Sequence, residues 1–111
     1  MSSAKEGNMQ ENAFKVSLLF PLVDNEGNPF EEEIWDSLYN KLFQLFRGFT
    51  EPGIAKGWWL GHSDLNRMIF IVVPTEEEIE QIKDLARWAR TQFRQDAMYF
   101  ECQRIYFEEI E

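Results

Sequence analysis

Six consecutive apolar residues, Met68 to Val73, are the feature of this chain that most constrains its fold. They lack the polar alternation of a half-exposed strand, which is typical of a strand that is covered on both faces. A chain of 111 residues is long enough for helices to cover one face of such a sheet, but not both. We therefore expect the other face to be covered from outside the chain, by a second copy or by a ligand.

Two amphipathic helices are predicted from their start signals and apolar stripes. The first begins at Asn28 and Pro29, a capping residue followed by the residue that suits the first helical position, and ends at Gly48. The second begins at Thr75, which stands three residues before Glu78 as in a capping box. In both, apolar residues recur at three- and four-residue spacing, so each helix has one face to bury.

Strand patterns lie around these helices. They cover residues 14–23, 54–62, 68–73 and 97–107, with turn-forming residues at 63–66 between the second and the third. Glycines at positions 53, 57 and 61 predict bulges and an edge position for the second strand. The alternation of the last strand shifts near Arg104, which predicts a bulge or a frayed end.

This order of elements predicts a ferredoxin-like α+β sandwich, βαββαβ, with two helices on one face of a four-stranded antiparallel sheet. The segment 68–73 is then central, and the opposite face is open, with Leu19 and one tryptophan adding to its apolar area. A monomer seldom exposes such a patch, so we expect a face-to-face homodimer. Residues 1–12 are polar and predict a flexible tail before a single domain at 13–111.

Composition narrows the function classes. The formal net charge of -9 disfavours nucleic acid, because phosphate neutralisation needs a surplus of Lys and Arg. The one cysteine, Cys102, is expected to pack in a buried strand and has no internal disulfide partner. No apolar run approaches the ~18 residues of a membrane span, and because residues 1–12 are polar we expect no secretory leader. We expect a soluble, cytoplasmic protein with no membrane association and no cofactor.

Trp58 and Trp59 are the first candidate site. As neighbours on a strand they point to opposite faces. We expect one in the core and the other on the open face near Tyr99, where it either anchors a dimer or lines a pocket between subunits. The enrichment of aromatic residues at interface hot spots favours the anchor.

Acidic side chains are expected to gather at both ends of the sheet. One group comprises six carboxylates and one histidine, namely Asp24, Glu26, Glu31, Glu32, His62, Asp64 and Asp96. Such a group can hold a divalent cation, but turn formation and helix-dipole complementarity explain it without one, and we expect no metal site. The other group comprises Glu51, Glu76, Glu77, Glu78, Glu108, Glu109 and Glu111. It either attracts a basic partner or is a solvated surface.

Arg87, Arg90 and Arg94 recur along one face of the second helix beside Trp88. They either contact an acidic ligand or pair with neighbouring carboxylates, and ion pairing is the commoner arrangement on a helix surface.

The segments GFTEPGIAKGWW and ARWARTQFRQDAMYFE resemble the G-[FL]-T…G-x-W and Y/W-x-x-x-F-x-Q-[DE] patterns of small, functionally uncharacterised bacterial and phage domains. This resemblance implies the same ferredoxin-like order. It marks Phe49, Thr50, Trp58, Gln95 and Asp96 as structurally special, and it implies no activity.

We expect a non-enzymatic, dimeric protein that binds a protein partner or a small ligand, as a regulator or accessory subunit. The candidate ligand or interface residues are Trp58, Trp59, His62, Tyr99, Arg87, Arg90 and Arg94, and no catalytic residue is assigned. Two enzymatic alternatives stay open. One is a small dimeric α+β-barrel enzyme with a cavity between sheet and helices, using His62, Asp64 or Tyr99. The other is a metal-dependent nuclease built on Asp24.

Overall fold

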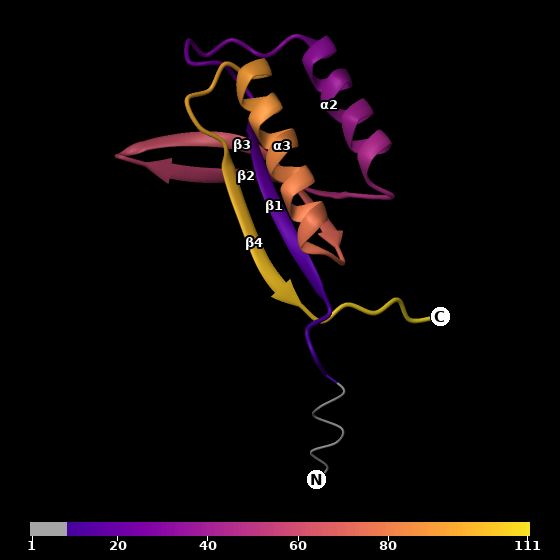
Figure 1. The fold of residues 1–111 in the computed structure, drawn as a ribbon. Coiled ribbons are helices and arrows are strands. Elements are labelled where there is room, and N and C mark those ends of the chain that lie inside the picture. The colour runs from indigo at the N-terminus through magenta and orange to yellow at the C-terminus, as the bar shows by residue number, and fades with distance from the viewer. Residues whose placement is uncertain (1–8) are drawn as a thin grey trace.

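Figure 1 shows a computed structural model in which both helices lie on one face of a single sheet. The structure describes residues 9–111, so most of the expected flexible tail lies outside the described part. The elements are β1 (Ala13–Pro21), α2 (Glu32–Leu45), β2 (Thr50–Trp59), β3 (His62–Val73), α3 (Glu76–Gln92) and β4 (Tyr99–Ile105). The strands are antiparallel in the order β2-β3-β1-β4. The predicted ferredoxin-like α+β fold, with β1 and β3 central, is confirmed.

The core fills the space between the sheet and the helices. Leu18 on β1 pairs with Ile69 on β3, and Val16 pairs with Ile71, so these four side chains share one face. The helices add the apolar stripes that the periodicity predicts, namely Leu38, Leu42, Ile82, Leu85 and Ala89. All of these side chains are buried, because the pleat of the strands and the period of the helices direct them into the same layer.

Phe93 closes the core just after the last turn of α3. Its side chain is fully buried. Its ring centroid lies 5.6 Å from that of Phe20, 4.9 Å from that of Phe30 and 4.9 Å from that of Trp35. The contacts with Phe30 and Trp35 are edge-to-face, an arrangement that aromatic rings prefer. Strand, loop and both helices therefore meet at this one side chain.

The start of α2 differs from the prediction. Asp24 Oδ1 accepts the backbone N–H groups of Glu26 and Asn28, each at 2.9 Å, so this side chain organises the loop after β1. Asn28 therefore belongs to the loop rather than to a helix cap. Pro29 forms an isolated bridge with Val23 instead of opening a helix.

The sequence also predicts where α2 ends and where α3 begins, and the second of these predictions is confirmed. α2 ends at Leu45 rather than Gly48, because Phe46 turns to extended backbone and is buried. At α3 the predicted cap is confirmed, since Thr75 Oγ1 accepts the N–H of Glu78 at 3.2 Å. The cap fixes where the helix leaves the end of β3.

The hairpin between β2 and β3 is longer than predicted. Trp59 pairs with His62, so the turn consists of Leu60 and Gly61. Both have positive φ, 51° and 81°, which is the geometry of a tight type I′ turn. Residues 63–66, predicted as the turn from their composition, lie within β3.

We call residues 56–64 the hairpin arm. β1 pairs with β3 only as far as Asn66, so in the arm each strand has only the other as a sheet partner. Figure 1 shows the arm projecting away from the helices. The predicted bulge in β2 is confirmed by a register shift between Thr50 and Gly53.

β4 ends earlier than predicted, at Ile105, which pairs with Ala13. The register with β1 is continuous up to that point. Of the two alternatives predicted near Arg104, the bulge is therefore wrong, and the change in alternation marks the end of the strand. Among the described residues, no helix has the length and apolar character needed to cross a membrane.

Phe93 provides a test of the fold. We expect Phe93→Ala to lower the free energy of unfolding by about 3–5 kcal/mol, because it removes a buried ring that three aromatic side chains contact. Phe43→Ala is the control, because Phe43 is 69% exposed and its loss should cost less than about 1 kcal/mol. Urea denaturation followed by circular dichroism measures both. Equal losses in the two variants would contradict this description of the core.

Candidate functional site: the open sheet face and the hairpin arm

The sheet face opposite the helices carries an apolar strip along its two central strands. By register, its members are Leu19, Met68, Phe70 and Val72. They are only half-buried, because no helix or strand among residues 9–111 lies over them. Tyr99 pairs with Leu19 and is 50% exposed at the border of the strip. The structure therefore places Tyr99 where the sequence predicts it.

Charged groups of both signs share this open face. Lys15 lies on β1, with its Nζ 4.3 Å from the centroid of the Phe70 ring. Glu101 lies on β4 opposite Ser17, one residue pair away from Lys15 on the neighbouring strand. Sequence reasoning missed both charges as site residues, although the alternation of the strands places them on this face.

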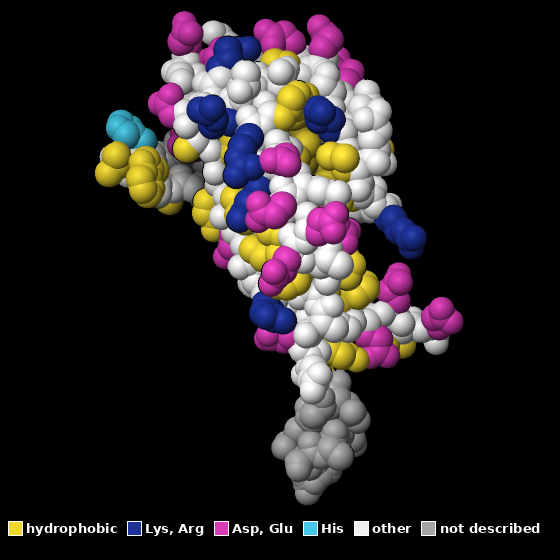
Figure 2. Space-filling view, in the orientation of Figure 1, with side chains coloured by type: hydrophobic (Ala, Val, Ile, Leu, Met, Phe, Trp, Pro, Cys, Tyr) yellow, Lys and Arg dark blue, Asp and Glu magenta, His cyan; other side chains and the backbone are white. Residues whose placement is uncertain are grey.

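The tip of the hairpin arm exposes three consecutive large apolar side chains. The exposed fractions of Trp58, Trp59 and Leu60 are 68%, 74% and 82%. Figure 2 shows hydrophobic side chains gathered beside the histidine at the projecting end of the molecule. The expectation that one tryptophan belongs to the core is wrong, because the late turn carries both of them beyond the helices.

The two tryptophans lie on opposite faces of the arm, as predicted. Trp59 is six positions from Gly53, which pairs with Met68 on the open face, so Trp59 continues that face. Trp58 lies on the other side, where the Nζ of Lys56 is 4.9 Å from its ring centroid.

A polar cluster that sequence reasoning did not predict joins α2 to the base of the hairpin. We call Trp35, Tyr39, Glu51 and Arg67 the Arg67 cluster. The Cζ of Arg67 lies 4.2 Å from the centroid of the Trp35 ring, and Nη1 donates to the Tyr39 hydroxyl at 2.8 Å. Tyr39 in turn donates to Glu51 Oε1. The bulge in β2 lies at Glu51, which places this carboxylate beside Arg67.

Arg67 keeps one unused donor in this cluster. Its Nε is buried and makes no hydrogen bond within the described residues, and Glu51 Oε2 is 3.8 Å away. Burial, together with the hydrogen bond to Glu51, raises the pKa of the Tyr39 phenol above its usual 10.0. Tyr39 is therefore protonated at neutral pH and orients the Glu51 carboxylate, whose side chain is 37% exposed.

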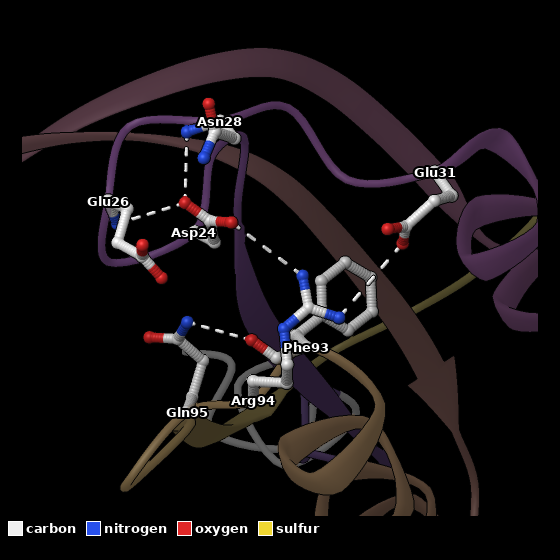
Figure 3. Close-up of polar contacts among 7 residues, drawn as sticks. All are labelled: Asp24, Glu26, Asn28, Glu31, Phe93, Arg94 and Gln95. Atoms are coloured by element: carbon white, nitrogen blue, oxygen red, sulfur yellow. Dashed lines mark hydrogen bonds and ion pairs between the residues drawn. The ribbon is translucent and has the colours of Figure 1, made fainter.

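A second polar group ties the end of α3 to the loop after β1 (Figure 3). Arg94 Nη2 lies 3.7 Å from Asp24 Oδ2, and Nη1 lies 4.0 Å from Glu31 Oε2. Arg94 follows the end of α3 with a φ of 52°, so it is not part of the predicted helical stripe. Gln95 Nε2 donates to the carbonyl of Phe93 at 2.8 Å and holds the same corner.

This arrangement accounts for part of the acidic group that the sequence predicts at one end of the sheet. Arg94 lies within ion-pair distance of both Asp24 and Glu31, while His62 and Asp64 lie in the hairpin arm. Within residues 9–111, no group of three or more His, Cys, Asp or Glu side chains is placed to hold a metal ion.

The other predicted site residues lie apart from these groups. Arg87 pairs with Asp84 at 2.7 Å, as expected for a helix surface with ion pairs. Arg90 Nη1 instead donates to the backbone carbonyl of Asp96 at 3.5 Å. Cys102 is exposed, which corrects the expectation of a buried cysteine, because it lies on the uncovered edge strand β4.

Comparisons with protein-family models and with curated proteins find no match. Among solved structures, the chain is similar to a phage SAM lyase in complex with S-methyl-5'-thioadenosine, with a TM-score of 0.58 and 15% identity over 88% of this chain and 85% of that one. It is also similar to a mutant of CutA1 from Pyrococcus horikoshii OT3, with a TM-score of 0.48 and 17% identity over 88% of this chain and 86% of that one. At such identities the first likeness shows a shared ferredoxin-like α+β fold.

Asp24 gives the site a testable pH dependence. The N–H of Asn28, helped by that of Glu26 and by Arg94, lowers the pKa of the Asp24 carboxyl below 3.8. A folded-state pKa below the unfolded value means that the carboxylate stabilises the fold above pH 3.8 and that this contribution is lost as pH falls through the folded-state pKa. As the pH falls, we expect the Asp24→Asn variant to lose less of its unfolding free energy than the wild type does. Urea denaturation at a series of decreasing pH values measures this difference.

The matched control for that titration is Asp36→Asn, an exposed carboxylate on α2. It should keep the wild-type slope. A wild-type slope in Asp24→Asn would show that the loop does not depend on this carboxylate.

Proposed function

We propose that the protein acts as a homodimeric binding protein whose two copies meet through their open sheet faces. The observation that carries this proposal is the strip of Leu19, Met68, Phe70 and Val72, which no described element covers. A continuous apolar strip with an aromatic border is typical of surfaces that are buried on association.

The charges of the open face favour a second copy as its cover. A two-fold contact brings the same patch of both copies together, so each group meets its counterpart twice. Lys15 and Glu101 are opposite in sign and lie on neighbouring strands. A two-fold axis that passes between them brings Lys15 of one copy to Glu101 of the other in both halves at once. This local match offsets the repulsion between two chains of net charge -9.

In this proposal the dimer works by binding, as a regulatory or accessory subunit in the cytoplasm. Its remaining surface offers the carboxylates that begin α3, Glu76, Glu77 and Glu78. Carboxylates that are gathered at one place attract basic groups, so a basic protein partner suits this end of the molecule.

Met68 tests the dimer. We expect Met68→Glu to convert a dimer into a monomer, because it introduces a like charge at the centre of both faces. Native mass spectrometry gives the stoichiometry and any retained ligand. Phe43→Glu, which adds the same charge at a 69% exposed site on α2, should leave the dimer intact. A wild-type protein that is a bare monomer at micromolar concentration would refute the proposal.

The Arg67 cluster favours a second candidate function, a small-ligand enzyme. It combines an oriented carboxylate, a protonated phenol and a guanidinium stacked on an indole at the base of the hairpin. Groups of these types recognise polar ligands with a flat apolar part. The SAM lyase that shares this fold was solved with S-methyl-5'-thioadenosine, so thioadenosines are the ligand class that we propose for this candidate.

Isothermal titration with S-methyl-5'-thioadenosine tests this second candidate. We expect saturable binding that Glu51→Gln weakens about tenfold or more, because a hydrogen bond to a charged group contributes about 1.5–3 kcal/mol. Glu80→Gln, an exposed carboxylate on α3, should bind as the wild type does. The absence of heat with the wild type would exclude this ligand class and leave the dimer proposal standing.

A further inference from the structure

The tip of the hairpin arm presents apolar side chains on both of its faces and at its end. Trp58 and Trp59 are exposed on opposite faces of the ribbon, and Leu60 is exposed in the turn. A flat protein surface can cover only one face of a ribbon. To remove all three side chains from water, the tip must therefore enter an apolar medium or a deep socket.

Polar residues opposite the tryptophans distinguish between these two environments. Trp59 pairs with His62, and Trp58 pairs with Ser63. A dry socket would leave these polar side chains without hydrogen-bond partners unless it supplied a matching group for each. At the boundary between lipid headgroups and hydrocarbon, water and apolar chains are both present, and tryptophan is enriched there. The composition of the tip therefore favours a lipid surface.

The first charged side chains of the arm lie a short way behind its tip. Residues 57–63 contain no Asp, Glu, Lys or Arg, and Lys56 and Asp64 flank them. Asp64 lies two residue pairs behind the pair of Trp59 with His62, which is about 7 Å along the strand. Elements that lie in a membrane interface are buried to about 5–10 Å. At that depth, one charge of each sign matches zwitterionic headgroups.

The turn at the tip has a leucine where the backbone does not favour one. Leu60 occupies the first central position of the type I′ turn at φ 51°, where such turns favour Asn, Asp or Gly. Asn at this position would relieve the backbone, so the fold does not account for the leucine. A contact with an apolar medium accounts for it, because that contact removes the side chain from water.

We propose that the hairpin arm inserts its tip into the interface of a lipid bilayer with zwitterionic headgroups. Trp58, Trp59 and Leu60 reach the boundary with the hydrocarbon, while Lys56 and Asp64 stay among the headgroups. Figure 1 shows the arm projecting from the body of the molecule. The charges of Lys56 and Asp64 cancel, so the rest of the chain carries the whole net charge of -9 and opposes anionic headgroups.

The contact is a shallow one. The arm is a two-stranded ribbon, so the outer backbone groups of each strand need water or headgroups as hydrogen-bond partners, which a position deep in hydrocarbon would deny them. The expectation of no membrane association rests on the lack of a spanning run, whereas a surface contact needs none. One tip is sufficient for this contact, so the inference goes beyond the proposed function and does not depend on the dimer.

Sedimentation with phosphatidylcholine vesicles tests the contact. We expect the vesicles to retain the wild-type protein and to shift its tryptophan fluorescence to shorter wavelengths. Leu60→Asn should lower the partition coefficient about fivefold or more, because it removes an inserted apolar side chain. Asn suits the turn, so this variant keeps the hairpin, and urea denaturation checks its stability. Phe43→Asn, which removes a 69% exposed apolar side chain from α2, should bind as the wild type does.

Lipid composition and salt distinguish insertion from charge attraction. Anionic phosphatidylglycerol in the vesicles should lower retention, and added salt should restore it, because the body is acidic. Retention that instead rises with anionic lipid and falls with salt would assign the contact to basic side chains and overturn the proposal. Equal retention of the wild type and Leu60→Asn also overturns it. No retention on phosphatidylcholine overturns it in favour of a protein socket for the tip, and the dimer, measured separately, is unaffected.

Discussion

The pairing of β1 with β3 is the interaction on which the rest of the structure depends. Because opposite residues of an antiparallel pair share a face, the register of Leu18 with Ile69 sends one set of side chains into the core. It also sends Leu19 and Met68 to the other side, where no helix of the described chain lies. The same register that builds the core thus creates the open face.

Much of the fold is predictable from the sequence because it depends on local periodicity. The capping pair at Thr75 and the apolar stripes of the helices are readable within a few residues of chain. The incorrect predictions concern side-chain hydrogen bonds and backbone angles that composition does not reveal. Asp24 bonds the backbone of its own loop and removes Asn28 from the helix, and Leu60 accepts a positive φ that no propensity assigns to leucine.

The candidate site was predictable in part for the same reason. The alternation of β3 and the position of Tyr99 predict the open face and its border, because strand parity decides which side each residue takes. The exposure of Trp58 follows from the length of the hairpin, which depended on the misassigned turn. The Arg67 cluster joins α2, β2 and β3 through contacts that no sequence spacing encodes. In the sequence, its place is marked only by the charge of Arg67 directly before the apolar run of β3.

The placement of β4 has a consequence for how the chain folds during synthesis. β4 pairs with β1, from Ala13 opposite Ile105 to Leu19 opposite Tyr99. The first strand therefore completes its pairing only after the last strand has been synthesised. Contacts that are so distant in sequence slow folding. Until β4 has left the ribosome, one edge of β1 has no partner strand, and the nascent protein is most open to chaperones and to aggregation during that interval.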